Sequence, residues 1–432
     1  MVKVKIVFLL FTLTLLCTGC IEDTIVIKEN TTVVPENTIS ADSVKDYDIA
    51  AANNAFAFDM YSQLAQLESG NESGNKRNVF FSPHSIYTAM AICYEGAEGT
   101  TKEQTSNVFY FPANKTILKV RMERTNNTIN SVNSDYELQT ANALWIQEGY
   151  PVKEAYIYNV KKYYDGEVTN LDFVRKPDAS RNTINKWVED KTSDKIKDLV
   201  PKNSITADTR VIITNAIYFN GKWVYEFDKE MTDKKPFYPT GGEEISLDTM
   251  YICNRFNYGE NSKAKIIELP YKGNDLSMYI VLPKNNNIEK FETGFTLNDY
   301  TKLKNDMESV EEVKVSIPKF KFETKTELTN SLIDMGVVDA FGPANFSGIS
   351  DDPLSISRVI HQTFIDVKEE GTEAAAATAV VMERGMSISW DPKPKEFKAD
   401  HPFMFFIEDR RTNCILFMGK VEYPEYEETE EI

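Results

Sequence analysis

The chain has 432 residues, of which 42% are hydrophobic and 26% are charged, a composition typical of a globular protein with a large core. Its formal net charge is −18, from 66 acidic and 48 basic side chains. This balance argues against nucleic acid as a partner, because phosphate-backbone binding needs clustered Lys and Arg. Length alone would predict about three domains of roughly 150 residues each.

The first 19 residues are predicted to be an export signal. Two lysines precede an apolar run from Ile6 to Leu16, which is too short to span a bilayer comfortably. The run ends in Thr18-Gly19-Cys20, a sequence that resembles the lipobox of prokaryotic lipoproteins, in which the cysteine after the cut is lipidated. We therefore expect an exported protein, extracellular or at the cell surface, whose contact with the membrane is a lipid anchor on Cys20.

Residues 20–45 are polar and rich in Thr and Asn, so they are predicted to form a flexible tether. The body of the chain, residues 46–424, contains no internal repeat and no linker, which favours one α+β domain over the three that length suggests. Its three cysteines, Cys93, Cys253 and Cys414, cannot all pair within the chain, so a large core rather than a disulfide framework must stabilise it. Residues 425–432 form an acidic tail.

Helices are predicted to dominate the first third of the body. Residues 47–67 have apolar spacing typical of an amphipathic helix, and a loop at 68–78 separates it from a short buried strand, VFFS. The segment SPHSIYTAMAICYEGA then begins a helix with Ser82 as its cap and Pro83 at the first helical position. TTKEQTSNVF is predicted to be another capped helix.

Strands are predicted to dominate the rest of the body. YELQTANALWIQ and TRVIITNAIYFNGKW are expected to be strands, the second buried on both faces because its apolar run is nearly continuous. KAKIIELPYKGNDLSMYIVLP predicts a hairpin around a Lys-Gly-Asn-Asp turn. In EEVKVSIPKFKFETKTEL, apolar and polar residues alternate and the alternation then breaks. Residues 364–367 are predicted to be a strand. ILFMGKVEYP is predicted to be a buried strand that closes the body.

The sequence contains no positive indication of catalysis. Its three histidines are His84, His361 and His401, and no nucleophile elbow, zinc-protease motif or phosphate-binding loop accompanies them. His361 is interpreted as a structural, hydrogen-bonding residue, because buried polar groups are normally satisfied. We therefore expect no enzyme, no metal site and no cofactor.

The segment after Gly371 permits two interpretations. As a helix, residues 373–384 are rich in helix formers, with an acid at the start and a base at the end. As a strand, side chains alternate between two faces. One face carries Thr372 and every second residue after it and contains no acid, whereas the other carries both Glu373 and Glu383. Such a strand could enter an existing sheet with its small, uncharged face toward a core, and Gly371 would supply the backbone freedom of a hinge.

At this point the residues resemble a known family. VKEEGTEAAAATA closely resembles the reactive-loop hinge of serpins, the metastable inhibitors of serine proteases. The resemblance extends over residues 46–424, through NVFFSPHSIYTAMAICYEGAEGTTKEQ, ITNAIYFNGKWVYEFD, ELPYKGNDLSMYIVLP, SRVIHQTFIDVKEEGTEA and HPFMFFIEDRRTNCILFMGKV, in serpin order. It implies an α+β serpin fold of three β-sheets and about nine helices around a central sheet, with an exposed reactive-centre loop.

The resemblance also implies a mechanism. A protease attacks the loop, an acyl-enzyme forms, and the cleaved loop inserts into the central sheet, carrying the protease with it. Thr372 and Ala374 to Ala377 would match the small-residue hinge of inhibitory members. The whole hinge would comprise eight residues: Glu370, Gly371, Thr372, Glu373, Ala374, Ala375, Ala376 and Ala377. A polar cluster beneath the central sheet would comprise Ser82, Ser85, Asn215 and His361. Trp223 would mark the top of the sheet, where insertion begins.

The cleaved bond remains open between two neighbours. Counting fifteen residues from Gly371, as in the usual serpin loop, predicts cleavage between Gly385 and Met386. Charge complementarity with a trypsin-like pocket favours Arg384-Gly385 instead. The resulting prediction is a monomeric suicide-substrate inhibitor of extracellular serine proteases, trypsin-like or subtilisin-like, with cysteine proteases as a further target class. The alternative is a non-inhibitory serpin that acts as a binding or structural protein at the cell surface.

Overall fold

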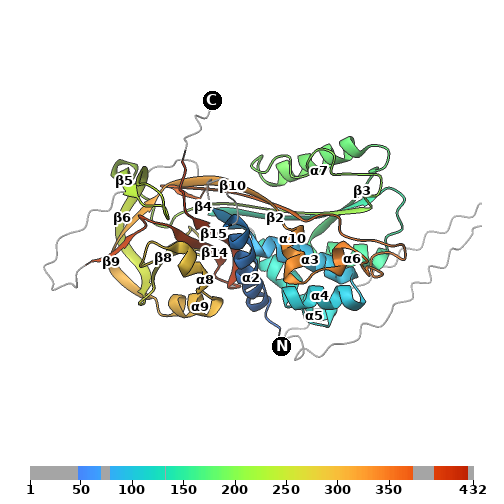
Figure 1. Cartoon of the computed structure of the whole chain (residues 1–432), viewed down its shortest axis with the longest axis horizontal. Helices are drawn as coiled ribbons and strands as arrows, with labels where there is room; N and C mark the ends of the chain where they lie inside the picture. Colours follow the sequence, from blue (N-terminus) through green and yellow to red (C-terminus); the bar gives the residue numbers. More distant parts are fainter. Residues whose placement is uncertain (1–46, 70–77, 132, 373–393, 427–432) are drawn as a thin grey trace, which may run out of the picture. The chain divides into compact units, whose positions relative to one another are not determined.

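A computed structural model describes residues 47–69, 78–131, 133–372 and 394–426. These residues all belong to one compact unit, Ala41–Ile432. Among them, no helix is both long enough and apolar enough to cross a membrane. The described residues form nine α-helices and two short 3₁₀-helices (Figure 1).

The helices lie mainly in the first half of the described chain. They are α2 (Ile49–Ser69), α3 (Pro83–Gly96), α4 (Gly99–Phe109), α5 (Lys115–Ile129), α6 (Glu154–Tyr164), α7 (Pro177–Lys191), α8 (Ile288–Thr293), α9 (Leu297–Asn305) and α10 (Thr329–Met335), with 3₁₀-helices η1 (Lys229–Met231) and η2 (Asp339–Phe341). As predicted, α3 begins at Pro83 with Ser82 as its cap, whose hydroxyl accepts a hydrogen bond from the Ser85 amide.

The predicted cap of α4 is wrong. Its cap position is Glu98, which makes no side-chain hydrogen bond to the helix. The two threonines at its start contact another part of the chain instead. The Thr100 hydroxyl donates to Asp339, and the Thr101 hydroxyl accepts from the Asn345 amide. Tertiary contacts have therefore taken the groups that a local cap would use.

A six-stranded sheet forms the centre of the fold. Its order is β10 (Phe320–Glu327), β11 (Ile360–Lys368), β12 (Gly371–Thr372), β4 (Val211–Lys222), β2 (Tyr136–Gln147) and β3 (Gly166–Leu171). The predicted strand YELQTANALWIQ is β2, and the predicted strand around residues 364–367 is the end of β11. β12 is antiparallel to both of its neighbours, so the long strands β4 and β11 run in the same direction on either side of it.

The remaining strands form one larger sheet. Its order is β1 (Val79–Phe81), β15 (Cys414–Val421), β14 (Phe403–Asp409), β8 (Leu276–Pro283), β7 (Ala264–Pro270), β6 (Ile245–Glu260), β9 (Glu308–Pro318) and β13 (Lys395–Lys398), and β5 (Asp233–Phe237) pairs with β6. The predicted hairpin is β7–β8. Pairing among the described residues thus gives two sheets where three were expected, because the 16-residue strand β6 is continuous and joins the strands on its two sides.

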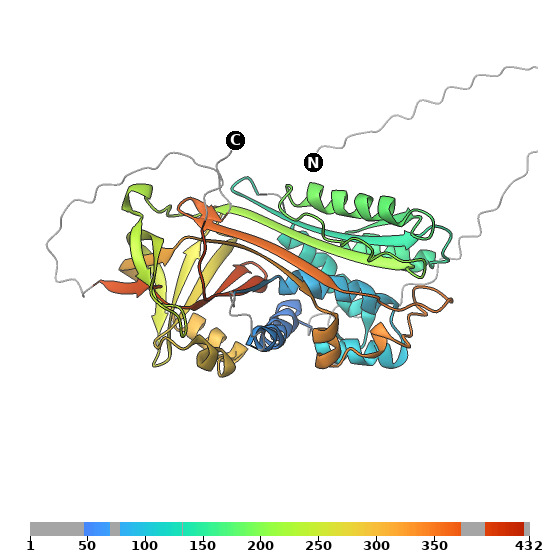
Figure 2. The same cartoon turned by 45° about the horizontal axis from the view of Figure 1, so that its top comes forward.

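The central sheet is covered on both faces, as Figure 2 shows for α7 on one side and α3 on the other. Alternation along β2 explains how. Ala143 and Trp145 pack with Ile184 of α7, whereas Leu144 and Ile146 face the main core, which also contains α3. A strand buried on both faces is expected to have a nearly continuous apolar sequence, as β4 does.

Candidate functional site

The predicted hinge begins inside the central sheet. Gly371 lies opposite Lys368 of β11 and Lys222 of β4, and Thr372 lies opposite Val367 and Gly221. Both residues are buried. Among the described residues, β12 is the element that pairs with β4 and β11 at this end, and no ladder joins those two strands directly. The hinge therefore starts as a short strand held between two long ones.

Glycine is required at position 371 by close backbone approach. A Cβ atom built there would lie 2.0 Å from the carbonyl oxygen of Gly221 and 2.7 Å from Cα of Lys222. Both of these are backbone atoms, which cannot move without displacing β4. The sequence assigned Gly371 to the hinge for its flexibility, and the structure adds a steric reason.

Thr372 points into an aromatic pocket at this end of the sheet. Its hydroxyl oxygen lies 2.7 Å from the phenol oxygen of Tyr271, and both side chains are buried. Trp223 stacks on Tyr271 with 4.5 Å between ring centroids. The Trp223 indole donates to the Lys368 carbonyl, and its backbone amide donates to the Glu370 carbonyl. Trp223 thus contacts the chain on both sides of the turn that leads into β12.

Two glutamates anchor the turn between β11 and β12. Glu369 is buried, accepts a hydrogen bond from Thr232 at 2.8 Å and pairs with Lys319 of the β9–β10 connection at 3.3 Å. Lys319 also lies over the ring of Tyr426, 4.2 Å from its centroid. Glu370 pairs with the largely exposed Lys229. The hinge is therefore tied to two segments outside its own sheet.

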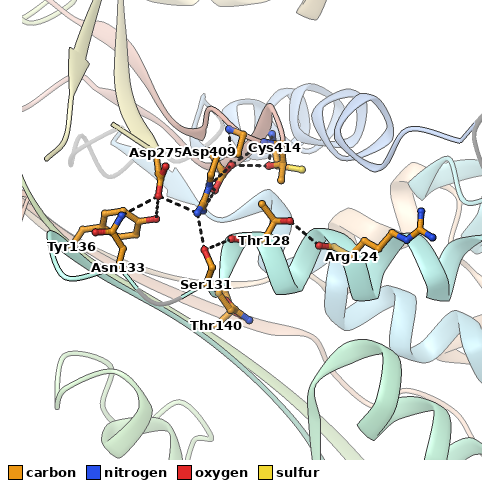
Figure 3. A network of polar contacts seen from close by, with 12 residues as sticks. Arg124, Thr128, Ser131, Asn133, Tyr136, Thr140, Asp275, Asp409 and Cys414 are labelled. Atoms are coloured by element: carbon orange, nitrogen blue, oxygen red, sulfur yellow. Dashed lines mark hydrogen bonds and ion pairs between the residues drawn. The ribbon is translucent and has the colours of Figure 1, made fainter. Parts of the chain in front are cut away.

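A polar network holds the neighbouring turn and β2 in place (Figure 3). Arg411, in the β14–β15 turn, pairs with Asp409 and Asp275 and donates to Ser131 after α5. Asp275, in the β7–β8 turn, also accepts a hydrogen bond from the phenol of Tyr136, the first residue of β2. Tyr136 lies opposite Gly221, so the network fixes the end of the sheet where the hinge begins.

At the opposite end of β4 and β11 there is unfilled space. A cavity of about 110 Å³ lies between their first residues and is lined by Val211 and Ile213 of β4, Ile360 and His361 of β11, and Ile86 and Met90 of α3. This volume exceeds that of a water molecule several-fold, and most of its lining is apolar. Within the described ranges, no strand pairs with β4 and β11 at this end of the sheet.

The predicted polar cluster lines and adjoins this cavity. The backbone amide of Ser82 donates to Nε2 of His361 at 2.9 Å, and the Ser82 hydroxyl donates to the Leu416 carbonyl. Ser85 follows one helical turn later and donates its amide to the Ser82 hydroxyl. Asn215 faces the same cavity from β4, where its amide contacts Asn142 rather than His361. The structure thus brings three of the four residues into contact and places the fourth across the cavity.

The environment of His361 predicts acid sensitivity. Burial lowers the pKa of His361 from 6.5 to about 3, because a buried imidazolium loses its hydration. The unfolded chain then binds the proton in preference to the folded one between about pH 6.5 and 3, so this stabilisation is present above pH 6.5 and is lost as pH falls. In His361→Gln, whose side chain can accept the same amide hydrogen but does not titrate, about 3 kcal/mol of the acid-dependent loss of stability should disappear between pH 7 and 4.

Unfolding midpoints of the parent and His361→Gln, measured in denaturant at several pH values, test this prediction. Equal pH dependence in the two proteins would contradict the assignment of His361 as an acid-sensitive group.

Several predicted residues lie outside the described part of the chain. They are Glu373, Ala374, Ala375, Ala376 and Ala377 of the hinge, the candidate cleavage residues Arg384, Gly385 and Met386, and the lipidation candidate Cys20. Conversely, sequence reasoning missed Tyr271, Lys319, Thr232 and Lys229. No local signal marks them, because each acts on the hinge through a contact between distant parts of the chain.

Comparisons with known proteins agree with this geometry. A family model described as "Serpin (serine protease inhibitor)" matches residues 51–424. An uncharacterized serpin-like protein of Methanosarcina acetivorans is 80% identical over 426 residues, covering 99% of this chain and all of the relative. Human serpin B4 is 36% identical over 399 residues, covering 87% of this chain and 99% of the relative. The solved structure of Serpin48, a highly specific serpin of the insect Tenebrio molitor, superimposes with a TM-score of 0.77 at 32% identity and covers 88% of this chain and 99% of that one.

Proposed function

The chain belongs to the serpin family of serine protease inhibitors, and we propose that it acts as an inhibitor that each molecule uses once. The family is one of inhibitors rather than of enzymes. In the proposed reaction, the serine hydroxyl of the target attacks the carbonyl carbon of the bait residue, and the C–N bond to the next residue breaks. The new amine takes a proton and the ester stays on the protease. Insertion of the loop then traps the ester before water hydrolyses it.

The main support is the seating of Gly371 and Thr372 between β11 and β4. A loop that starts as a paired strand needs only to continue its pairing, so no separate nucleation step is required. The two neighbours are parallel to one another, and among the described residues no ladder joins them beyond β12, so an antiparallel strand added there would find backbone groups on both sides to pair with.

Extending the observed register gives the destination of each residue. Gly371 lies opposite Lys222 of β4 and Lys368 of β11. If the pairing continued for seven more residues, Thr378 would lie between Asn215 of β4 and His361 of β11. In the inserted state the Thr378 side chain would share the face of Thr372 and lie level with the polar cluster. Ala374 and Ala376, which share this face, are small enough to pass between the strands.

Two features of the sequence define the proposed target. Arg384 suits the acidic pocket of trypsin-like proteases, and subtilisin-like or elastase-like proteases, with Met382 or Met386 as further contacts, are the alternative targets. Cysteine proteases, which also form acyl-enzymes, are a further target class. We place the protein at the cell surface, held by a lipid on Cys20, on the strength of its signal-like first 19 residues.

The test is a gel experiment with two proteases. The purified chain is incubated with trypsin or subtilisin and then denatured. We expect a covalent complex that survives denaturation, a fixed stoichiometry of inactivation, and a C-terminal fragment whose mass shows whether residue 384 or 385 precedes the cut. Clean cleavage with full protease activity would instead support the non-inhibitory alternative, a serpin that binds or organises other molecules.

A further inference from the structure

Three contacts fix the β7–β8 turn, residues 271–275, against the hinge end of the central sheet. The amide of Lys272 donates to the Lys222 carbonyl at 2.7 Å. Tyr271 forms a bridge with Trp223, and Asp275 accepts from Tyr136. These contacts come from different strands, so the position of Tyr271 is set by the body of the protein and not by the hinge.

The phenol of Tyr271 is enclosed by aromatic rings. Phe219 packs edge-on against it at 4.7 Å and Trp223 stacks on it at 4.5 Å between centroids. Burial raises the pKa of Tyr271 well above its ordinary value, so the group stays a neutral hydroxyl. A neutral hydroxyl can donate or accept, and its partner here is the Thr372 hydroxyl at 2.7 Å.

Withdrawal of Thr372 from the sheet would break this pair and leave the Tyr271 hydroxyl buried without its partner. An unpaired buried hydroxyl is disfavoured more strongly than an intact pair is favoured. The contact therefore resists withdrawal of Thr372 from the sheet.

We propose that Tyr271 is a positioning residue whose hydroxyl holds Thr372 in the sheet before cleavage and so sets the resting depth of loop insertion. Its effect on inhibition rests on the function proposed above. With Thr372 seated, insertion starts at once after cleavage and the acyl-enzyme is trapped. With Thr372 released, insertion starts later and a larger share of the acyl-enzyme is hydrolysed, so the chain is consumed as a substrate.

The experiment compares Tyr271→Phe, Thr372→Val and the double variant with the parent. Hydrogen–deuterium exchange of the uncleaved chain, followed in peptides covering residues 368–372, reports seating without any protease. We expect exchange to rise about three- to tenfold in each single variant, in proportion to one lost buried hydrogen bond. In the double variant, two apolar groups of similar shape face each other, so exchange should return to within about twofold of the parent. The stoichiometry of inhibition should likewise rise in each single variant and return toward the parent's value in the double variant.

Tyr156→Phe is the matched control. Tyr156 is equally buried and its phenol donates to the Ile92 carbonyl at 3.0 Å, between α6 and α3. The Tyr156→Phe substitution should lower the unfolding midpoint as Tyr271→Phe does but leave hydrogen–deuterium exchange at residues 368–372 unchanged. Equal exchange at the hinge in Tyr271→Phe and the parent, or a double variant no better than the singles, would overturn the proposal. If the parent forms no covalent complex, the proposed function fails, whereas the exchange measurement still decides the role of Tyr271.

Discussion

Thr372→Arg should turn the protein from an inhibitor into a substrate. The side chain at this position is buried against Tyr271 and faces the core. An arginine would bring a charge into a pocket of aromatic rings, and burial of a charge without a paired anion is disfavoured by several kcal/mol. We expect the hinge to leave the sheet, insertion after cleavage to fail, and the stoichiometry of inhibition to rise at least about tenfold, as measured by titrating protease activity and by loss of the covalent complex on gels.

Thr372→Ser is the control for this substitution, since it keeps the hydroxyl and adds no charge. It should inhibit nearly as well as the parent. A Thr372→Arg protein that still traps protease with the parent's stoichiometry would show that residue 372 does not face the core when the loop inserts.

Glu369→Ala should be the most destabilising of the proposed changes. It removes the carboxylate that pairs with buried Lys319 and that accepts the Thr232 hydroxyl. Removing one partner of a buried ion pair ordinarily costs about 3–5 kcal/mol. The ring of Tyr426 would still stabilise the charge of Lys319 in the variant. We therefore expect the free energy of unfolding to fall by about 3 kcal/mol, near the lower end of this range, as measured by denaturant unfolding followed by tryptophan fluorescence.

Glu311→Ala provides the comparison at an exposed ion pair. Glu311 pairs with Arg255 on the surface, where both side chains are more than half exposed, and such pairs contribute at most about 1 kcal/mol. Similar losses in the two variants would mean that burial of the Glu369–Lys319 pair has no energetic consequence.

The parts of the fold that were predictable are those with a local signal. A nearly continuous apolar run identifies β4, Pro83 after a serine marks the start of α3, and the Lys-Gly-Asn-Asp turn identifies the β7–β8 hairpin. In each case the residues that determine the element lie within it or beside it. Resemblance to the serpin family supplied the rest of the architecture, including the helices that periodicity did not reveal.

The parts that were not predictable depend on contacts between distant residues. Tyr271 reads in sequence as the first residue of a hairpin turn, and nothing near it indicates a partner 101 residues later. Lys319 reads as one polar residue in an alternating strand, although it pairs with a glutamate of the hinge. The threonines of α4 suggest a cap and make tertiary contacts instead. The contacts that each of these residues makes are determined by the tertiary fold and not by neighbouring residues in the sequence.

The order of strands in the larger sheet has a consequence for biosynthesis. β1 lies beside β15, and β14 separates β15 from β8, so the first of the described strands has its neighbour more than 330 residues away. A ribosome makes β14 and β15 last, and until then β1 and β8 have no partner at this position. This part of the core therefore closes only after the last strands have been synthesised. Such distant pairing also predicts slow folding.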